Sequence, residues 1–478
     1  MANSPATPET PAERAKELLR LTTKRFANLT KQDKIFFTAV ALGEPTWLTP
    51  QEDIPDWKER TEKKWIKKNK GPWTPQANLG ADRIQWACTD PVATPLVAKE
   101  GVQLVGATVN GLLDLGYAQL DFPLIINDSV FEVAPQMRDA ALPLLSLTGS
   151  RLPGLYAAGL RVAGQVNLRD GFHATGEVRL LGASIGGNLS CSGGRFENDG
   201  GDALSADSLQ VGGSVFFREQ CRFNGELDFV NAEVQGYFHL HDLHKESKIT
   251  MLRMERARVG VLRDDEAAWP AAGKLHMDGF QYDRIHGKSP LAGKLRIGWL
   301  ERMPAGEFLP QPYEQLAKVY SEMGHEGDAK TILIAKNRAR TRQMRWRDGW
   351  LIKKLVRYLF DWTIAYGYRP AQSLVWIFAI ILAGTFIFRA AYSTCDMLPS
   401  PSYQRILDSV DNPVSVAERA EFNAFFYSMD TFVPLVDLNQ ESYWRPIGWR
   451  RGYLWGHILA GWVLSTLFVT GMTGVLKR

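Results

Sequence analysis

The sequence is poor in cysteine and has no large excess of charge of either sign. Four cysteines among 478 residues exclude a disulfide framework, and a formal net charge of +4 argues against binding nucleic acid by bulk charge. Residues 1–13 lack a basic start followed by an apolar stretch, so we predict no signal peptide there. A length of 478 residues allows about three domains, and 45% hydrophobic residues exclude an intrinsically disordered chain.

Changes in composition along the chain predict five regions. They are a disordered tail at 1–13, a helical leader and cap at 14–100, a β-solenoid at 101–305, a helical hairpin with a basic linker at 306–348, and a membrane domain at 349–478. The expected fold is therefore mixed β and α. It is a parallel β-solenoid with helical caps, followed by a two-helix transmembrane domain.

One pattern recurs from Gly101 to about Ile285. Each copy begins with apolar residues at every second position, continues with a small residue and a glycine, and ends with apolar residues at every second position. Examples are VRLLGASIGGNLSC from Val178 and LDFVNAEVQGYFHL from Leu227. The glycines in this slot are Gly111, Gly154, Gly187, Gly213 and Gly236. The later copies follow one another about 24 residues apart, and this spacing together with the two-residue alternation predicts stacked coils of short strands. We expect the glycine to permit a sharp corner between strands.

The stretch 56–73 mixes basic residues with Trp57, Trp65 and Trp73. Such a stretch could contact RNA or anionic lipid. No nucleic-acid motif accompanies it, so we favour a solvated helix face whose tryptophans pack on the next domain. No nucleic-acid partner is expected.

The sequence HLHDLH at 239–244 is the one metal-like cluster in the chain. The alternation of the repeat turns His239 and His241 outward together, at a spacing that could hold zinc with Asp242 or His244. Histidines on a solenoid wall without a metal are commoner. The chain has no Walker loop, no Cys-x-x-Cys and no dinucleotide-binding unit, so we predict no cofactor and no catalytic residue.

Two apolar stretches near the C-terminus, 372–388 and 453–475, are predicted to span a bilayer. Basic residues are dense before the first span. The positive-inside rule therefore places the solenoid and both chain termini in the cytoplasm, with two spans in the membrane.

The residues before the first span, 349–368, predict a helix lying in the membrane interface. The cations expected to contact the membrane surface are Lys353, Lys354, Arg357 and Arg369. In the second span, small residues four apart allow close helix packing: Gly456 with Ala460, and Gly461 with Ser465. They favour a homo-oligomer, or equally the packing of the two spans within one subunit.

Residues 420–437, between the spans, are too short and too polar to cross a bilayer comfortably, so we predict a re-entrant or interfacial helix. Span, short helix and glycine-bearing span loosely resemble the pore domain of two-helix ion channels. Asp430, Asp437 and Glu441 are the candidates to line such a pore. The glycines of a potassium filter are replaced by 433–436 (VPLV), which excludes potassium selectivity by that route.

Several segments resemble a family of uncharacterised bacterial membrane proteins with a degenerate pentapeptide-like solenoid, often labelled membrane-associated oxidoreductase. They include WACTDPVATPLV at 86–97, GLLDLGYAQLDFPL at 111–124, PYEQLAKVYSEMGHEGDA at 312–329, YGYRP at 366–370 and YSMDTFVPLVDLNQESYWRP at 427–446. The resemblance implies an architecture and a bacterial inner membrane rather than an activity.

Two functions of different classes fit these observations. The first is a non-enzymatic scaffold or recognition module, held by the lipid bilayer and binding a cytosolic protein partner. The second is an oligomeric pore gated by the cytosolic solenoid. A membrane-associated oxidoreductase is the third and weakest interpretation, because no cofactor motif supports it.

Overall fold

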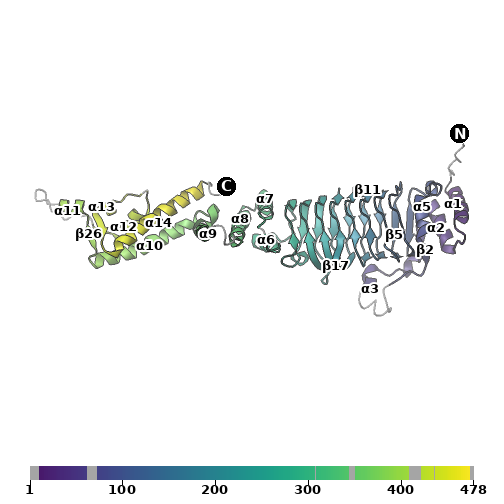
Figure 1. The fold of residues 1–478 in the computed structure, drawn as a ribbon, viewed down its shortest axis with the longest axis horizontal. Helices are drawn as coiled ribbons and strands as arrows, with labels where there is room; N and C mark the ends of the chain where they lie inside the picture. The colour runs from purple at the N-terminus through teal and green to yellow at the C-terminus, as the bar shows by residue number, and fades with distance from the viewer. Residues whose placement is uncertain are drawn as a thin grey trace, which may run out of the picture. The chain divides into compact units, whose positions relative to one another are not determined.

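The computed structural model describes residues 10–61, 73–306, 308–343, 350–407, 421–434 and 436–473. The chain forms two compact units, Met1–Ile332 and Leu333–Arg478 (Figure 1). The predicted tail up to residue 9, Trp65 and the end of the chain after residue 473 lie outside the described residues.

The first unit contains a parallel β-solenoid of about eight turns, which confirms the predicted fold. Each strand pairs in parallel with strands of the neighbouring turns (Figure 1). A complete turn holds four short strands, as in β11 (Arg161–Val162), β12 (Val166–Asn167), β13 (His173–Ala174) and β14 (Val178–Arg179). The solenoid wall therefore has four faces.

The face that contains β12 also includes β1 (Thr46–Trp47), β3 (Val102–Val105), β5 (Leu124–Asn127), β8 (Leu145–Ser146), β16 (Leu189–Ser190), β19 (Val215–Phe217) and the ends of β21 (Glu233–Leu240) and β23 (Arg258–Asp264). The face before it in each turn holds β7 (Ala141–Leu142), β11, β15 (Ser184–Ile185), β18 (Gln210–Val211), and the starts of β21, β23 and β25 (Gln281–Ile285).

The face that contains β13 also holds β2 (Asn78–Gly80), β4 (Thr108–Asn110), β6 (Val130–Phe131), β9 (Arg151–Leu152) and the starts of β17 (Arg195–Ser205), β20 (Arg222–Asp228) and β22 (Lys248–Arg253). The fourth face holds β10 (Leu155–Tyr156), β14, the ends of β17, β20 and β22, and β24 (Leu275–His276).

The core is built from inward side chains that stack from turn to turn. One buried column consists of Val178, Leu204, Leu227, Leu252 and Leu275, which are neighbours in register. Because each turn covers the apolar side chains of the next, burial contributes about 1.5–3 kcal/mol per large side chain only when the turns are stacked.

The repeated glycines allow the turns to approach closely, which corrects the reason we expected for them. A Cβ at Gly187, Gly213 or Gly236 would lie 2.7–2.8 Å from a backbone carbonyl oxygen of the preceding turn. Their φ angles are not positive, and the left-handed corner positions fall on other residues, such as Asp170 with φ 50°. Among the matched glycines Gly111 differs, because its φ is +84° and a Cβ there would meet open space.

Helices cover the first turn. α1 (Pro11–Arg25) and α2 (Lys31–Leu42) each begin with a capping box, and they pack with α5 (Ala81–Thr89) through the rings of Phe37 and Trp86, 5.6 Å apart. η1 (Gln51–Asp53), α3 (Trp57–Thr61) and η2 (Thr94–Leu96) complete this region. The Trp57 ring lies against Gly193 of the solenoid, as the packing interpretation of this stretch predicts. The cap covers a strand edge that would otherwise be open.

The last turns are covered by η3 (Glu266–Ala268), α6 (Gly293–Leu300), α7 (Gln311–Glu322) and the start of α8 (Glu326–Arg342). Arg296 of α6 is fully buried and donates to both carboxylate oxygens of Asp264, at 2.6 and 2.7 Å. Its guanidinium carbon lies 5.4 Å from the ring centre of Trp269 and 5.1 Å from that of Trp299. This buried ion pair ties the helical cap to the end of β23.

The second unit contains α9 (Trp350–Ile364), η4 (Ala365–Gly367), α10 (Gln372–Ser393), β26 (Met397–Pro399), α11 (Pro401–Leu407), α12 (Ala424–Phe432), α13 (Gln440–Tyr443), β27 (Trp444–Pro446) and α14 (Trp449–Met472). The helices α10 and α14 are long and apolar enough to cross a membrane. α12 packs against both of them (Figure 1).

Most of the apolar surface of α10 and α14 is not covered by the rest of the chain. Val375, Phe378 and Phe386 of α10 are exposed, and so are Leu459 and Trp462 of α14. The core helix of a soluble protein would bury such side chains, so their exposure favours contact with lipid.

Candidate functional site

A groove of about 190 Å³ lies on the outer side of β12, β16 and β19. Asn167, Ser190 and Phe216 are neighbours in register on these strands and point outward, because the alternate residues are buried in the core. The residues lining the groove are Gln165, Asn167, Arg169, Asn188, Ser190, Phe216 and Arg218. The groove therefore offers amide, hydroxyl and guanidinium groups beside one aromatic ring.

The two arginines of the groove are paired only with their neighbours in sequence among the ion pairs that the structure describes. Nε of Arg169 lies 3.3 Å from Asp170 Oδ2, and Nε of Arg218 lies 3.2 Å from Glu219 Oε1. The guanidinium of Arg218 also stacks over the Phe216 ring, 4.9 Å from its centre. Exposed ion pairs of this kind are weak, so both guanidiniums can reach an anionic group that enters the groove.

A row of rings extends the groove along the same face. His239 stacks on Phe216 at 4.9 Å and on Tyr237 at 5.2 Å, with interplanar angles of 18° and 15°. Arg263 follows His239 in register on β23. We call this surface the groove face and define it by Asn167, Arg169, Ser190, Phe216, Arg218, Tyr237, His239 and Arg263. Arginine and aromatic side chains are the types that dominate protein interfaces.

The structure brings together two of the three predicted zinc ligands. His239 Nδ1 lies 3.2 Å from His241 Nε2, whereas Nδ1 of His244 accepts a hydrogen bond from the Glu246 backbone. In the described part of the chain, no three His, Cys, Asp or Glu side chains are grouped so that they could hold a metal. Burial, and then the neighbouring charges of His241 and two arginines, lower the pKa of His239 to about 4. His239 is therefore uncharged at neutral pH.

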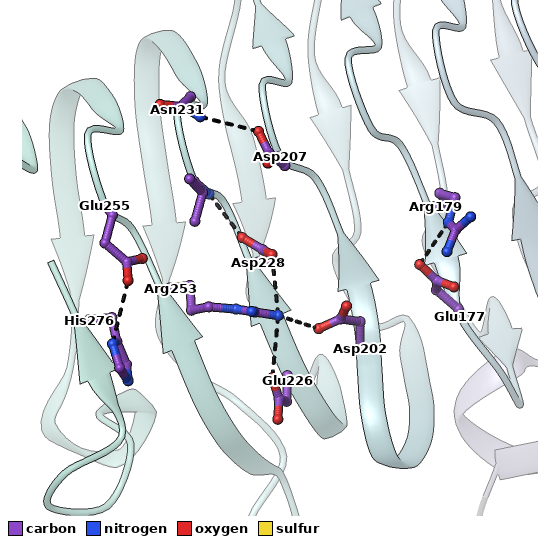
Figure 2. Close-up of polar contacts among 11 residues, drawn as sticks. Glu177, Arg179, Asp202, Asp207, Glu226, Asp228, Asn231, Arg253, Glu255 and His276 are labelled. Carbon is purple, nitrogen blue, oxygen red and sulfur yellow. Dashed lines mark hydrogen bonds and ion pairs between the residues drawn. The ribbon is translucent and has the colours of Figure 1, made fainter. Parts of the chain in front are cut away.

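A second polar surface lies two strands further along each turn. Figure 2 shows Arg253 among three carboxylates on the fourth face of the solenoid. Its Nη2 atom lies 2.8 Å from Asp202 Oδ1, 3.3 Å from Glu226 Oε2 and 3.2 Å from Asp228 Oδ2. These residues come from β22, β17 and β20, so one guanidinium links three consecutive turns.

The other polar groups on this surface are also partnered. Arg179 donates to Glu177 at 2.9 Å, Asn231 donates to Asp207 at 3.4 Å, and His276 lies 3.4 Å from Glu255 (Figure 2). We call this surface the ion-pair face and define it by Glu177, Arg179, Asp202, Asp207, Glu226, Asp228, Asn231, Arg253, Glu255 and His276. Carboxylates outnumber arginines on this face, and Arg253 links three turns through three of them, so we assign the face a role in holding the turns together.

The acids predicted to line a pore are Asp430 in the last turn of α12, Asp437 in the loop that follows, and Glu441 in α13. Asp430 is buried and accepts hydrogen bonds from the backbone N–H groups of Leu438 and Glu441, at 2.7 and 2.9 Å. Asp437 is exposed and accepts from the Asn439 N–H at 3.0 Å. Burial and the charges of Asp430 and Asp437 raise the pKa of Glu441. Asp430 thus holds the loop of its own chain, and the pore-lining role stays a prediction.

The small residues of the second span have different surroundings. Gly461 lies directly against the Phe432 carbonyl of α12, and Ala460 packs on the cluster around Phe432. Gly456 is exposed and a Cβ there would meet open space, and Ser465 is half-buried. Gly461 and Ala460 therefore serve packing within one chain. Self-association stays a prediction.

The predicted membrane-surface cations lie on or after α9. Lys353 and Arg369 are exposed, and Lys354 and Arg357 are half-buried. The same helix exposes Leu355 and Trp362. An amphipathic helix of this composition is typical of a membrane interface.

The groove was missed by the sequence analysis, because amides, a serine and a phenylalanine form no recognised motif. The available signal was the outward position of Asn167, Ser190 and Phe216 in successive copies of the repeat. No protein-family model, curated protein or solved structure matches the chain. The resemblance to the uncharacterised membrane family therefore stays a prediction, whereas the fold defines a β-solenoid with two candidate membrane spans.

Proposed function

We propose that the protein is a membrane-anchored recognition module that binds a cytosolic protein partner on the groove face. The observation that carries the proposal is the groove itself, with Arg169, Arg218 and Phe216 gathered on one outer wall of the solenoid. The two candidate spans would hold that wall, and the bound partner, at the inner membrane of a bacterial cell.

The chemistry of the groove favours an acidic segment of the partner. A carboxylate could accept hydrogen bonds from the guanidiniums of Arg169 and Arg218, and the amides around Asn167 could bind the backbone on either side. Tyr237, beside the groove, offers an exposed ring of the kind that anchors protein interfaces. The His239 side chain is neutral at physiological pH, so it adds no positive charge to the groove face.

Photo-crosslinking in cells tests this proposal with a matched pair of tyrosines. Tyr237 on the groove face and Tyr156 on β10 are each 40% exposed. Replacing either one with p-benzoylphenylalanine should preserve the fold. We expect position 237 to form a discrete protein adduct on irradiation and position 156 to form none. Equal adducts from both positions, or none from position 237, would contradict the proposal.

The proposed membrane topology can be tested by labelling the native cysteines. Cys88, Cys191 and Cys221 are buried, whereas Cys395 is exposed just after α10. With both termini in the cytoplasm, Cys395 should react with a membrane-impermeant maleimide added to intact spheroplasts, and Cys395→Ser should abolish the label. Labelling only after lysis would place this loop on the cytoplasmic side.

A second function, an oligomeric pore gated by the solenoid, is favoured by one observation. The carboxylates of Asp437 and Glu441 are exposed next to a short helix that packs between the two candidate spans. Purified protein in liposomes should then conduct cations, and Asp437→Asn should reduce the flux. Absence of flux from a folded oligomer would contradict the pore and leave the recognition module as the remaining proposal.

A further inference from the structure

The two arginines that line the groove lie two turns of the solenoid apart. The backbone N–H of Asp170 donates to the Ser192 carbonyl at 2.8 Å, and that of Gly193 donates to the Arg218 carbonyl at 3.0 Å. These bonds continue the strand register and place Arg169, Ser192 and Arg218 side by side on three successive turns. Since neighbouring parallel strands are about 4.8 Å apart, the backbones at Arg169 and Arg218 are separated by about 9.6 Å along the solenoid.

Both arginines can donate to a ligand in the groove. The side chains of Arg169 and Arg218 are 50% and 37% exposed, and each contacts the acid that follows it in the sequence through Nε. The two terminal nitrogens of each guanidinium can therefore donate to a further carboxylate. A ligand with two carboxylates at the separation of the two arginines would engage both guanidiniums at once.

This separation distinguishes among the regular backbone conformations. Side chains on one side of an extended strand recur about every 6.7 Å, which does not match two turns of the solenoid. An α-helix reaches a similar separation only after seven residues, and its diameter of about 10–12 Å with side chains is too wide for a groove of about 190 Å³. A polyproline II helix advances about 9.3 Å in three residues, so its side chains at i and i+3 point the same way at the required distance.

The other groups of the groove suit the same conformation. A polyproline II helix has no internal hydrogen bonds, so its backbone N–H and C=O groups need other partners. The amides of Gln165 and Asn167 line the groove and can both donate and accept. Phe216 also lines it, and the exposed ring of Tyr237 lies beside it on the groove face. Aromatic rings along a groove are the usual surface on which proline-rich segments dock.

We infer that the groove binds a polyproline II segment of the partner in which two acidic residues stand three positions apart. One carboxylate lies opposite Arg169 and the other opposite Arg218. The inference rests on the recognition function proposed above, and it specifies the conformation and the acid spacing of the bound segment. Prolines between the acids fix the conformation before binding, which lowers the entropy lost on association. The spacing separates the partner from acidic proteins in general.

Fluorescence anisotropy with the purified full-length protein in detergent tests the spacing. Three labelled peptides have the same composition of two glutamates in a run of prolines, and the glutamates stand two, three or four positions apart. We expect the peptide with glutamates three apart to bind about tenfold more tightly than the other two, because only it offers a carboxylate to each guanidinium.

Substitutions of the arginines test which groups read the spacing. Arg169→Gln and Arg218→Gln should each weaken the peptide with glutamates three apart about tenfold, which brings it to the level of the other two peptides. Arg179→Gln, on the ion-pair face, is the matched control and should change nothing. The variants Arg169→Lys and Arg218→Lys keep the charge and should bind better than the glutamine variants, which separates loss of charge from loss of fold.

The possible failures can be told apart. Equal binding of the three peptides, lost in Arg218→Gln, would overturn the spacing and leave recognition of acids by the groove. No binding of any peptide, while a crosslinker at position 237 still captures a partner, would overturn the acidic ligand and leave the recognition module. No peptide binding and no adduct would overturn both. Displacement of the peptide by a single-stranded oligonucleotide of equal charge would overturn the inference in favour of a nucleic-acid site.

Discussion

The groove face and the ion-pair face belong to the same turns of one solenoid, but their arginines have different partners. On the ion-pair face, Arg253 is shared by three carboxylates from neighbouring turns. On the groove face, Arg169 and Arg218 pair only with adjacent residues among the described ion pairs, and line a cavity instead. Charges partnered across turns stabilise the stack, whereas polar groups left facing a groove are available to a ligand.

The strongest effect is expected where a charge pair is completely buried. Arg296→Ala would leave Asp264 buried without its partner, and we expect the free energy of unfolding to fall by about 3–5 kcal/mol. Denaturant unfolding of the full-length protein in detergent measures this change in the free energy of unfolding. Arg284→Ala, on an exposed arginine of β25, is the control and should change little. A loss below 1 kcal/mol for Arg296→Ala would show that this pair does not hold the cap.

The comparison of the two faces predicts unequal costs for two similar substitutions. Arg253→Ala removes the shared partner of three carboxylates and should destabilise the fold by about 1–3 kcal/mol. Arg218→Ala removes an exposed ion pair and the stacking on Phe216 at the surface, and should cost less than about 1 kcal/mol. The same unfolding measurement applies to both. Equal losses would remove the distinction between a stabilising face and a binding face.

A smaller effect should appear in the pH dependence of the Arg253 substitution. Burial, with the charges of Asp202 and Asp207, raises the pKa of Asp228 although Arg253 acts against the shift. A carboxyl with a raised pKa stabilises the fold when protonated, and that contribution is lost as the pH rises through the folded-state pKa. Arg253→Ala raises the pKa further, so its cost should be larger at pH 7 than at pH 4. A cost independent of pH would contradict the electrostatic account.

Local patterns in the sequence were sufficient for the fold. The alternation around Val178 and Leu227 predicted short strands, and the common period predicted their stacking, because both depend on residues close together in the chain. A helix begins at Gln372, where the first span was predicted to start, and it continues to Ser393, beyond the predicted end at 388. The role of the repeated glycine was wrong in detail, since the crowding at Gly213 comes from the neighbouring turn and not from its own φ angle.

The site depends on contacts that the local pattern does not contain. Arg253 meets Asp202 across 51 positions of sequence, and the groove arises from residues of three different turns. The carboxylate of Asp430 accepts hydrogen bonds from backbone N–H groups of a loop that follows it in the sequence. The sequence pattern alone did not indicate that Asp430 holds this loop. Register between turns, rather than residue type, decides which polar groups meet.

The most direct test of the division between the two faces reverses one charge on each while the crosslinker stays at position 237. Arg218, 37% exposed on the groove face, and Arg179, 46% exposed on the ion-pair face, are the matched pair. We predict that Arg218→Glu abolishes the crosslinked adduct and that Arg179→Glu leaves it intact. An adduct that survives Arg218→Glu, or that disappears equally in both variants, would contradict recognition through the groove face.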